Sequence, residues 1–178
     1  MKNVVILHGT SETKDSFWYP WITAELEKRG YSVSIPKLPD ADEPDIHKWL
    51  PDALQETYTE ETILIGHSAG CPLMLAVLEQ LERPIAQAIF VAAYFENVNP
   101  VTGILKPTYD WDTIRGNAHD RIIINSDNDP WHCDEQQARK LFAHIGGTMI
   151  IRSGEGHMGS DMYHQPYKEF PFLLSLIK

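Results

Sequence analysis

Cysteine is scarce in this sequence, and the few cysteines present do not form a paired motif. The 178 residues include only Cys71 and Cys133, and no CxxC spacing occurs. This count disfavours both a disulfide scaffold and a structural zinc site. We therefore expect two reduced thiols, as in a cytoplasmic protein. A chain of this length can bury a core of its own, so we expect one domain over residues 1–178.

Long apolar runs and an excess of basic residues are also missing. The N-terminal stretch "MKNVVILHGT" places four apolar residues before His8, too few for a signal-peptide core or a membrane span. Fifteen Lys and Arg stand against 25 Asp and Glu, which gives a net charge of -10. An acidic surface repels nucleic acid and anionic membranes. We expect neither as a partner, and we expect a small neutral or cationic ligand instead.

What the sequence does contain is a series of short runs rich in Val, Ile and Leu. Most of them are apolar without alternation, which is typical of strands buried on both faces of a parallel sheet. The six predicted strands cover residues 3–7, 31–35, 62–65, 88–93, 121–125 and 148–152. Helical patterns lie between them, over residues 19–30, 44–58, 69–82, 134–147 and 165–178. Pro51 predicts a kink or restart in the second helix, and Pro171 interrupts the last.

Alternating strands and helices predict an α/β fold. We expect a three-layer sandwich in which a mostly parallel six-stranded sheet carries helices on both faces. Ligands of such sheets bind beyond the carboxyl ends of the strands. The segment from Tyr94 to Asp120 shows no clear element, and a connection of that length usually acts as a lid or a pocket wall.

The motif G-x-S-x-G occurs in "TILIGHSAG", residues 62–70, between a predicted strand and a predicted buried helix. In that setting the serine lies on a tight strand-to-helix turn with its hydroxyl exposed and its φ positive. Only glycine at Gly66 and Gly70 would avoid a side-chain clash across the turn. A serine that merely caps the helix would not explain both glycines. We therefore predict that Ser68 is a nucleophile.

A serine nucleophile needs a base, and the base needs a group that orients it. "TMIIRSGEGHMG" offers His157 in a loop past one predicted strand, and "RIIINSDNDPWHC" offers Asp127 and Asp129 past another. The order Ser68, Asp129, His157 is the one expected for this fold. Asp129 precedes Pro130, which fixes the turn, whereas Asp127 could cap the loop. His132, in the acid loop itself, competes with His157 as the base.

The oxyanion that forms during acyl transfer needs two fixed N–H donors. We expect one from the backbone of Ala69, directly after the serine at a helix start. The other should come from the loop "HGTSE" after the first strand, where Thr10 or Ser11 can offer an N–H and we favour Thr10.

Several tryptophans fall near the predicted mouth of the site. We expect Trp21 and Trp49 to pack in the core. Trp18, Trp111 and Trp131 fall at strand ends, where they could form an apolar pocket for an acyl or alcohol group. No metal is expected, since the histidines, Asp127, Asp129 and Cys133 near this edge show no ligand spacing such as HExxH.

With these residues in place, the chain resembles the α/β-hydrolases, and in particular the small retinoblastoma-binding-protein-nine and YdeN-type serine hydrolases. The resemblance rests on "GHSAG", on residues 6–33 and 35–54, on "SDNDPW" and on "GEGHMG". It implies a minimal hydrolase without leading antiparallel strands or a large cap domain, the triad Ser68, Asp129 and His157, and no cofactor. His132 and Cys133 depart from the family, in which an aliphatic residue and a proline are common there.

Together these observations predict a serine hydrolase of small carboxylic esters, of the carboxylesterase type. Small amides or peptides are alternative substrates. A member of the same fold that binds a protein partner without turnover is the alternative function, although such a protein has no need of a strained serine. A metal-dependent hydrolase is the remaining alternative.

Overall fold

The computed structural model describes residues 2–96 and 103–178, and these contain one parallel sheet. Its strands are β1 (Asn3–Leu7), β2 (Ser32–Ser34), β3 (Ile63–His67), β4 (Ile85–Val91), β5 (Ala118–Ser126) and β6 (Thr148–Arg152). They lie in the order β2-β1-β3-β4-β5-β6, and every neighbouring pair is parallel. The expected sheet is therefore confirmed, with no antiparallel strand among the described residues.

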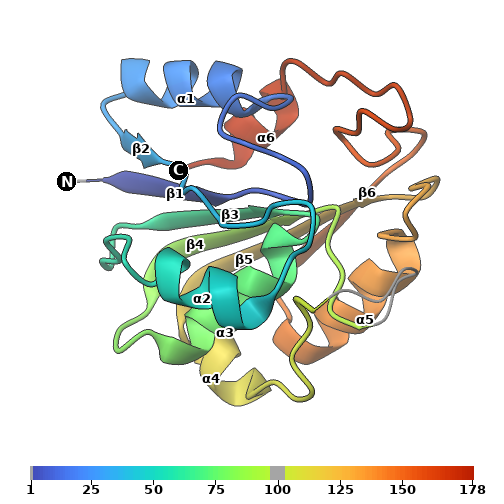
Figure 1. The fold of residues 1–178 in the computed structure, drawn as a ribbon. Helices are drawn as coiled ribbons and strands as arrows, with labels where there is room; N and C mark the ends of the chain where they lie inside the picture. Colours follow the sequence, from blue (N-terminus) through green and yellow to red (C-terminus); the bar gives the residue numbers. More distant parts are fainter. Residues whose placement is uncertain (1, 97–102) are drawn as a thin grey trace.

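Helices cover both faces of the sheet, as the alternation of elements predicted (Figure 1). They are α1 (Tyr19–Lys28), α2 (Ile46–Ala53), α3 (Gly70–Gln80), α4 (Trp111–Gly116), α5 (Glu135–Ile145) and α6 (Pro171–Leu176). Helices α1 and α6 lie on one face, and α2, α3, α4 and α5 lie on the other (Figure 1). The three-layer sandwich is confirmed.

The burial of each strand follows its place in the sheet. All five residues of β3 are buried, whereas β2 and β6, at the two edges, are only partly buried. Helix α3 packs on β3 and is buried from Gly70 to Leu78. A strand and a helix that are apolar on nearly every side can only lie at the centre of a layered fold. This pair therefore fixes the turn between them, at Ser68, above the core.

The segment from Tyr94 to Asp120, expected to lack a clear element and to act as a lid or a pocket wall, contains a helix and the start of a strand, and its Tyr94 lines the cavity described below. Helix α4 begins after Asp110, whose carboxylate accepts the N–H of Thr113 at 3.1 Å. Strand β5 begins at Ala118, three residues before the predicted start. An Asp at the N-cap is the signal for a helix that the sequence analysis missed. Residues 97–102, part of the predicted lid, lie outside the described residues.

Two proline predictions have different outcomes. Helix α2 runs through Pro51 and ends at Ala53, so it does not restart at the proline. The C-terminal helix begins at Pro171 rather than crossing it, because a proline fits the first turn of a helix, where its missing N–H costs nothing.

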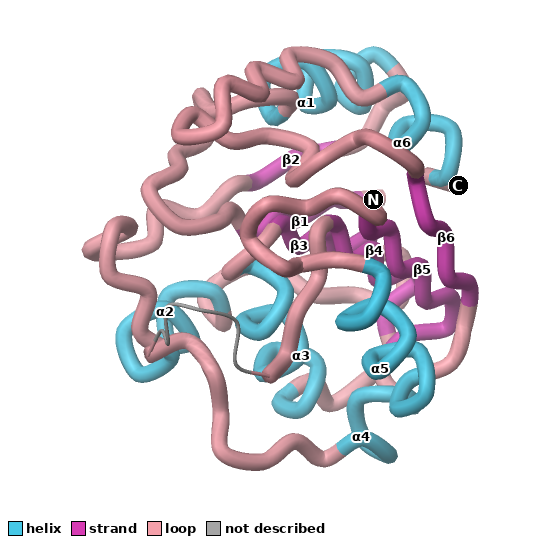
Figure 2. Tube along the Cα trace, turned by 90° about the vertical axis from the view of Figure 1, so that its right-hand side faces the viewer, coloured by secondary structure: helices cyan, strands magenta, loops and turns pink. Residues whose placement is uncertain are grey.

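Loops cover the edge of the sheet at which the strands end (Figure 2). Because all six strands are parallel, the loops after β1, β3, β5 and β6 meet there. These loops carry the residues singled out above. Among the described residues, no helix combines the length and apolar character needed to cross a membrane.

Candidate active site

Ser68 lies on a strained turn between β3 and α3. Its φ is 51°, in the left-handed region that non-glycine residues rarely adopt. A Cβ added to Gly66 would lie 2.8 Å from the carbonyl oxygen of Gly70, and one added to Gly70 would lie 2.0 Å from that of Leu7. Neither position has room for a side chain. The predicted clash across the turn is confirmed at Gly66, whereas the backbone of β1 is what excludes a side chain at Gly70. Ser68 itself is partly exposed and faces a cavity.

His157 and Asp129 meet at this edge of the sheet, from the loops after β6 and β5. Nδ1 of His157 lies 2.7 Å from Oδ2 of Asp129, and both side chains are buried. The other oxygen of Asp129 accepts the N–H of Trp131 at 2.8 Å. A carboxylate at Nδ1 favours the tautomer that carries its proton on that nitrogen, which leaves Nε2 free to accept one. The pair therefore has the arrangement of an oriented base.

Asp127 and His132, the competing candidates, point elsewhere. Asp127 is exposed and accepts the N–H of Gly154 at 2.9 Å, and this hydrogen bond lowers the pKa of its carboxyl. Asp127 thus caps a loop, as one of the two sequence interpretations held. His132 is exposed, with a φ of 60°. The structure therefore brings Asp129, and not Asp127, to His157.

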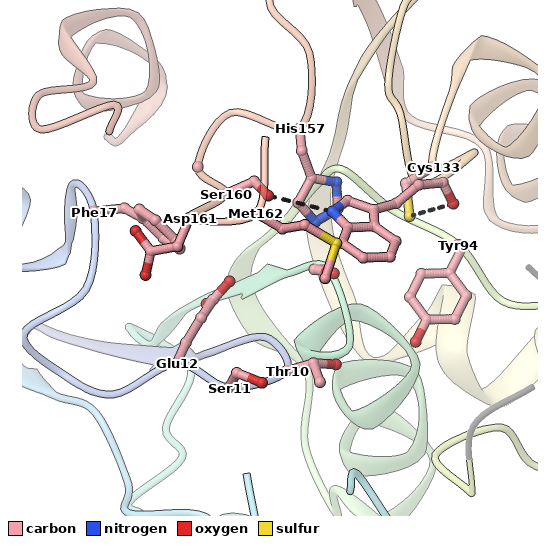
Figure 3. Close-up of a pocket in the computed structure, with 13 residues that line it drawn as sticks. Thr10, Ser11, Glu12, Phe17, Tyr94, Cys133, His157, Ser160, Asp161 and Met162 are labelled. Atoms are coloured by element: carbon pink, nitrogen blue, oxygen red, sulfur yellow. Dashed lines mark hydrogen bonds between the residues drawn. The ribbon is translucent and has the colours of Figure 1, made fainter. Parts of the chain in front are cut away.

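A cavity of about 440 Å³ connects these elements. Ser68, His157, Thr10 and Trp131 all line it. In Figure 3, His157 lies across the cavity from Thr10, and Phe17 and Cys133 stand on opposite sides. Within the described part of the chain Ser68 Oγ makes no hydrogen bond, and catalytic hydrogen bonds are often long before substrate binds. Ser68 and His157 therefore share a cavity that could hold a substrate between them.

Two backbone N–H groups beside Ser68 have no partner among the described residues, those of Thr10 and Ala69. Ala69 is the N-cap of α3, where the helix dipole favours negative charge. Ser11, the alternative donor, is excluded because its N–H bonds the carbonyl oxygen of Ala41 at 2.8 Å. The unpaired N–H groups are thus at the two positions that the sequence predicted for an oxyanion site.

The predicted aromatic pocket needs correction at two of its three positions. Trp18 is fully buried and donates its indole N–H to the carbonyl of Met158 at 3.1 Å, so it belongs to the core. Trp111 lies in α4 and stacks on His144, with ring centroids 4.2 Å apart, away from the cavity. Both predictions were wrong. The sequence did not show that α4 begins at Trp111, and the hydrogen bond of Trp18 joins residues 140 positions apart, which local pattern does not predict. Trp131 does line the cavity, and Trp49 is buried in the core as expected.

Several further cavity residues were missed, four of which form much of its walls. Glu12, Tyr94, Met162 and Cys133 line the walls together with the residues named above. Glu12 follows Gly9 by three residues in the predicted oxyanion loop, and this position was the only available signal. Met162 is 69% exposed at the rim, in a stretch with no recognisable pattern.

Among the described residues, one group could offer ligands to a metal ion: Asp129, Cys133 and His157, whose ligand atoms lie within 4.8 Å of one another. Burial raises the pKa of the Cys133 thiol well above its ordinary value, and this opposes the thiolate form that binds metals. The carboxylate and the imidazole already bind each other. These residues therefore suit a hydrogen-bonded acid and base better than a metal centre.

This chain is similar in sequence to known hydrolases. The sequence profile of the family described as "Serine hydrolase" matches residues 4–175. "Putative hydrolase YdeN" of Bacillus subtilis is 31% identical over 137 residues, which cover 72% of this chain and 71% of that protein.

Solved structures show the same architecture. The crystal structure of the Bacillus subtilis ydeN gene product is 26% identical with a TM-score of 0.89, over 99% of this chain and 96% of that one. Mouse alpha/beta hydrolase domain-containing protein 10 is 12% identical with a TM-score of 0.73, over 98% and 87%. Est1E from Butyrivibrio proteoclasticus, in a structure with ferulic acid bound, is 14% identical with a TM-score of 0.69, over 100% and 87%. The last two likenesses show the α/β-hydrolase fold alone.

Proposed function

Because this chain belongs to the serine hydrolase family, we propose that it cleaves carboxylic esters through an acyl-enzyme on Ser68. One observation carries the proposal: an imidazole held by a buried carboxylate lines the same cavity as a serine on a strained turn. A serine hydroxyl is a weak nucleophile, and an adjacent oriented base is what activates it.

In the proposed reaction, Ser68 Oγ attacks the ester carbonyl carbon while His157 Nε2 takes the hydroxyl proton. Asp129 keeps the proton on Nδ1 and stabilises the imidazolium that forms. The N–H groups of Thr10 and Ala69 bind the oxyanion. His157 then gives its proton to the departing alcohol, which leaves an acyl group on Ser68. A water molecule, deprotonated by His157, releases the acid in the same way.

The cavity indicates the size and polarity of the substrate. Its volume of about 440 Å³ and the side chains of Phe17, Trp131 and Met162 suit a small ester with an apolar acyl or alcohol group. The net charge of -10 favours a neutral or cationic molecule over an anion. We therefore propose short-chain alkyl or aryl esters as the substrate class.

The test is turnover of a panel of p-nitrophenyl esters of increasing acyl length by the wild type and by Ser68→Ala. The exposed Ser175, whose hydroxyl bonds the Phe172 carbonyl in α6, provides the control Ser175→Ala. We expect Ser68→Ala to lose a factor of about 10⁴ or more in kcat, and Ser175→Ala to match the wild type. Repeating the assay in EDTA tests a metal-dependent route, which would lose activity there. Equal turnover by Ser68→Ala and the wild type would contradict the proposal.

A further inference from the structure

A carboxylate and an imidazole lie buried beside each other against the cavity. Glu12 lines the cavity, and its side chain is 6% exposed, while that of His67 is fully buried. Nδ1 of His67 lies 3.1 Å from Oε1 of Glu12. The same carboxylate accepts the N–H of Gly9 at 2.7 Å and the hydroxyl of Tyr19. Three donors therefore hold one carboxylate, which is what a buried charge requires.

The partners of both ring nitrogens favour a charged His67 ring. Nε2 lies 3.0 Å from the backbone carbonyl oxygen of His157, a group that can only accept a hydrogen bond. Nδ1 faces the Glu12 carboxylate, which also accepts, and it lies 3.1 Å from the hydroxyl oxygen of Tyr19, whose proton is donated to Glu12. A ring that donates from both nitrogens is an imidazolium. In agreement, burial alone would lower the pKa of His67, but the charge of Glu12 raises it overall, and the charge of His67 and its hydrogen bond lower the pKa of Glu12.

The pair joins three loops that the proposed reaction depends on. Glu12 and Gly9 belong to the loop after β1 that presents the Thr10 N–H, His67 directly precedes Ser68, and the bonded carbonyl belongs to His157. In Figure 3, Glu12 lies beside Ser11 and Thr10, across the cavity from His157. The loop after β1 packs closely against Glu12 and Ser68 at Gly9. A Cβ on Gly9 would lie 2.7 Å from Glu12 Oε1 and 3.0 Å from Ser68 Cβ.

We propose that Glu12 and His67 are positioning residues of the hydrolase reaction, an inference that rests on the proposed function. Glu12 holds the backbone that carries the Thr10 N–H, and His67 holds the backbone of His157. Both act through other groups, and the pair fixes where the oxyanion donor and the base lie relative to Ser68. Apolar residues of similar volume often fill such a space without a loss of stability, but they could not make the hydrogen bonds to Gly9 and to the His157 carbonyl.

The test is Glu12→Gln, which keeps the size of the side chain and removes its charge. Glu79 provides the matched control: its side chain is also 6% exposed and pairs with Lys106, at the end of α3 remote from Ser68. Misplacing an oxyanion donor lowers kcat more than substrate binding, so we expect Glu12→Gln to lose about 10- to 100-fold in kcat with KM within about twofold. Glu79→Gln should keep both constants within about twofold of the wild type.

His67→Gln is the second variant, and the same loss in kcat is expected from it. Turnover by folded Glu12→Gln within about threefold of the wild type would overturn the proposal, as would an equal loss in Glu79→Gln. Nitrogen NMR of the wild type needs no variant: both ring nitrogens of His67 should carry protons at pH 7, and a neutral ring overturns the proposal. Absence of turnover by the wild type would instead contradict the proposed function, while the NMR result would still report on the pair.

Discussion

Nδ1 of His157 lies 2.7 Å from Oδ2 of Asp129, although 28 residues separate the two along the chain. The contact forms because β5 and β6 are neighbouring parallel strands, so the loops that follow them leave the same edge of the sheet. The proposed base is therefore oriented before any substrate arrives, and such preorganisation lowers the cost of reaching the transition state.

Asp129→Asn tests this orientation most simply. An amide can donate to Nδ1, which favours the tautomer with its proton on Nε2, where it cannot act as a base. We expect kcat/KM for a short-chain p-nitrophenyl ester to fall by a factor of about 10³–10⁴. Asp127→Asn is the matched control, since its exposed carboxylate bonds Gly154 and Ser153 in the loop after β6 and not His157, and it should stay within about threefold. Equal losses in the two variants would contradict the assignment of Asp129.

Gly70→Ala tests the packing beneath the nucleophile turn. A methyl group at position 70 would lie 2.0 Å from the carbonyl oxygen of Leu7, so β1 and α3 must move apart. We expect the free energy of unfolding in urea to fall by about 1–3 kcal/mol. Gly116→Ala, at the end of α4 with nothing within 4 Å of the added carbon, should change it by less than about 1 kcal/mol. A Gly70→Ala protein as stable as the wild type would show that the turn is less crowded than the structure indicates.

Trp131→Ala tests which tryptophan meets the substrate. Trp131 lines the cavity, whereas Trp111 stacks on His144 outside it. We expect Trp131→Ala to raise KM for an aryl ester about tenfold, because burial of a ring against an apolar group is lost. Trp111→Ala should leave KM within about twofold, even if it lowers stability. A larger rise in KM for Trp111→Ala than for Trp131→Ala would instead indicate that Trp111 contacts the substrate.

The pH dependence of stability tests the Glu12–His67 pair. The pKa of Glu12 is lowered from 4.5. Its contribution to the free energy of unfolding is therefore present above pH 4.5 and is lost as the pH falls through the pKa of Glu12 in the folded protein. The pKa of His67 is raised from 6.5. Its contribution to the free energy of unfolding is therefore present below pH 6.5 and is lost as the pH rises through the pKa of His67 in the folded protein. The two stabilising contributions are both complete only between pH 4.5 and pH 6.5.

The measurement compares urea unfolding of the wild type and of the double variant Glu12→Gln/His67→Gln across this range. The stability difference should be greatest between pH 4.5 and 6.5 and should shrink on either side. Tyr19 and His8 also face the pair: burial raises the pKa of Tyr19, which is neutral in this range, and lowers the pKa of His8. Both residues are present in the two proteins that are compared. A difference that grows as pH rises above 6.5 would contradict a charged His67.

The order of layers and the turn at Ser68 could be predicted because each depends on local pattern. Uninterrupted apolar runs indicated buried parallel strands, and the glycines at 66 and 70 indicated a turn without room for side chains. The choice of Asp129 over Asp127 depended mainly on Pro130, since both carboxylates follow the same strand and differ in the direction of their side chains. Trp111 was misplaced because α4 was not predicted, and the start of a helix decides which way a side chain points. Trp18 was misplaced although its helix was predicted, because its indole bonds a residue distant in the sequence, Met158.

Covalent labelling by a fluorophosphonate reports on the proposed nucleophile itself. We expect intact-mass spectrometry of the wild type to show a single adduct and peptide mapping to locate it on Ser68. Ser68→Ala and Asp129→Asn should label not at all or far more slowly. An adduct on another residue, or equal labelling of Ser68→Ala, would show that Ser68 is not the nucleophile.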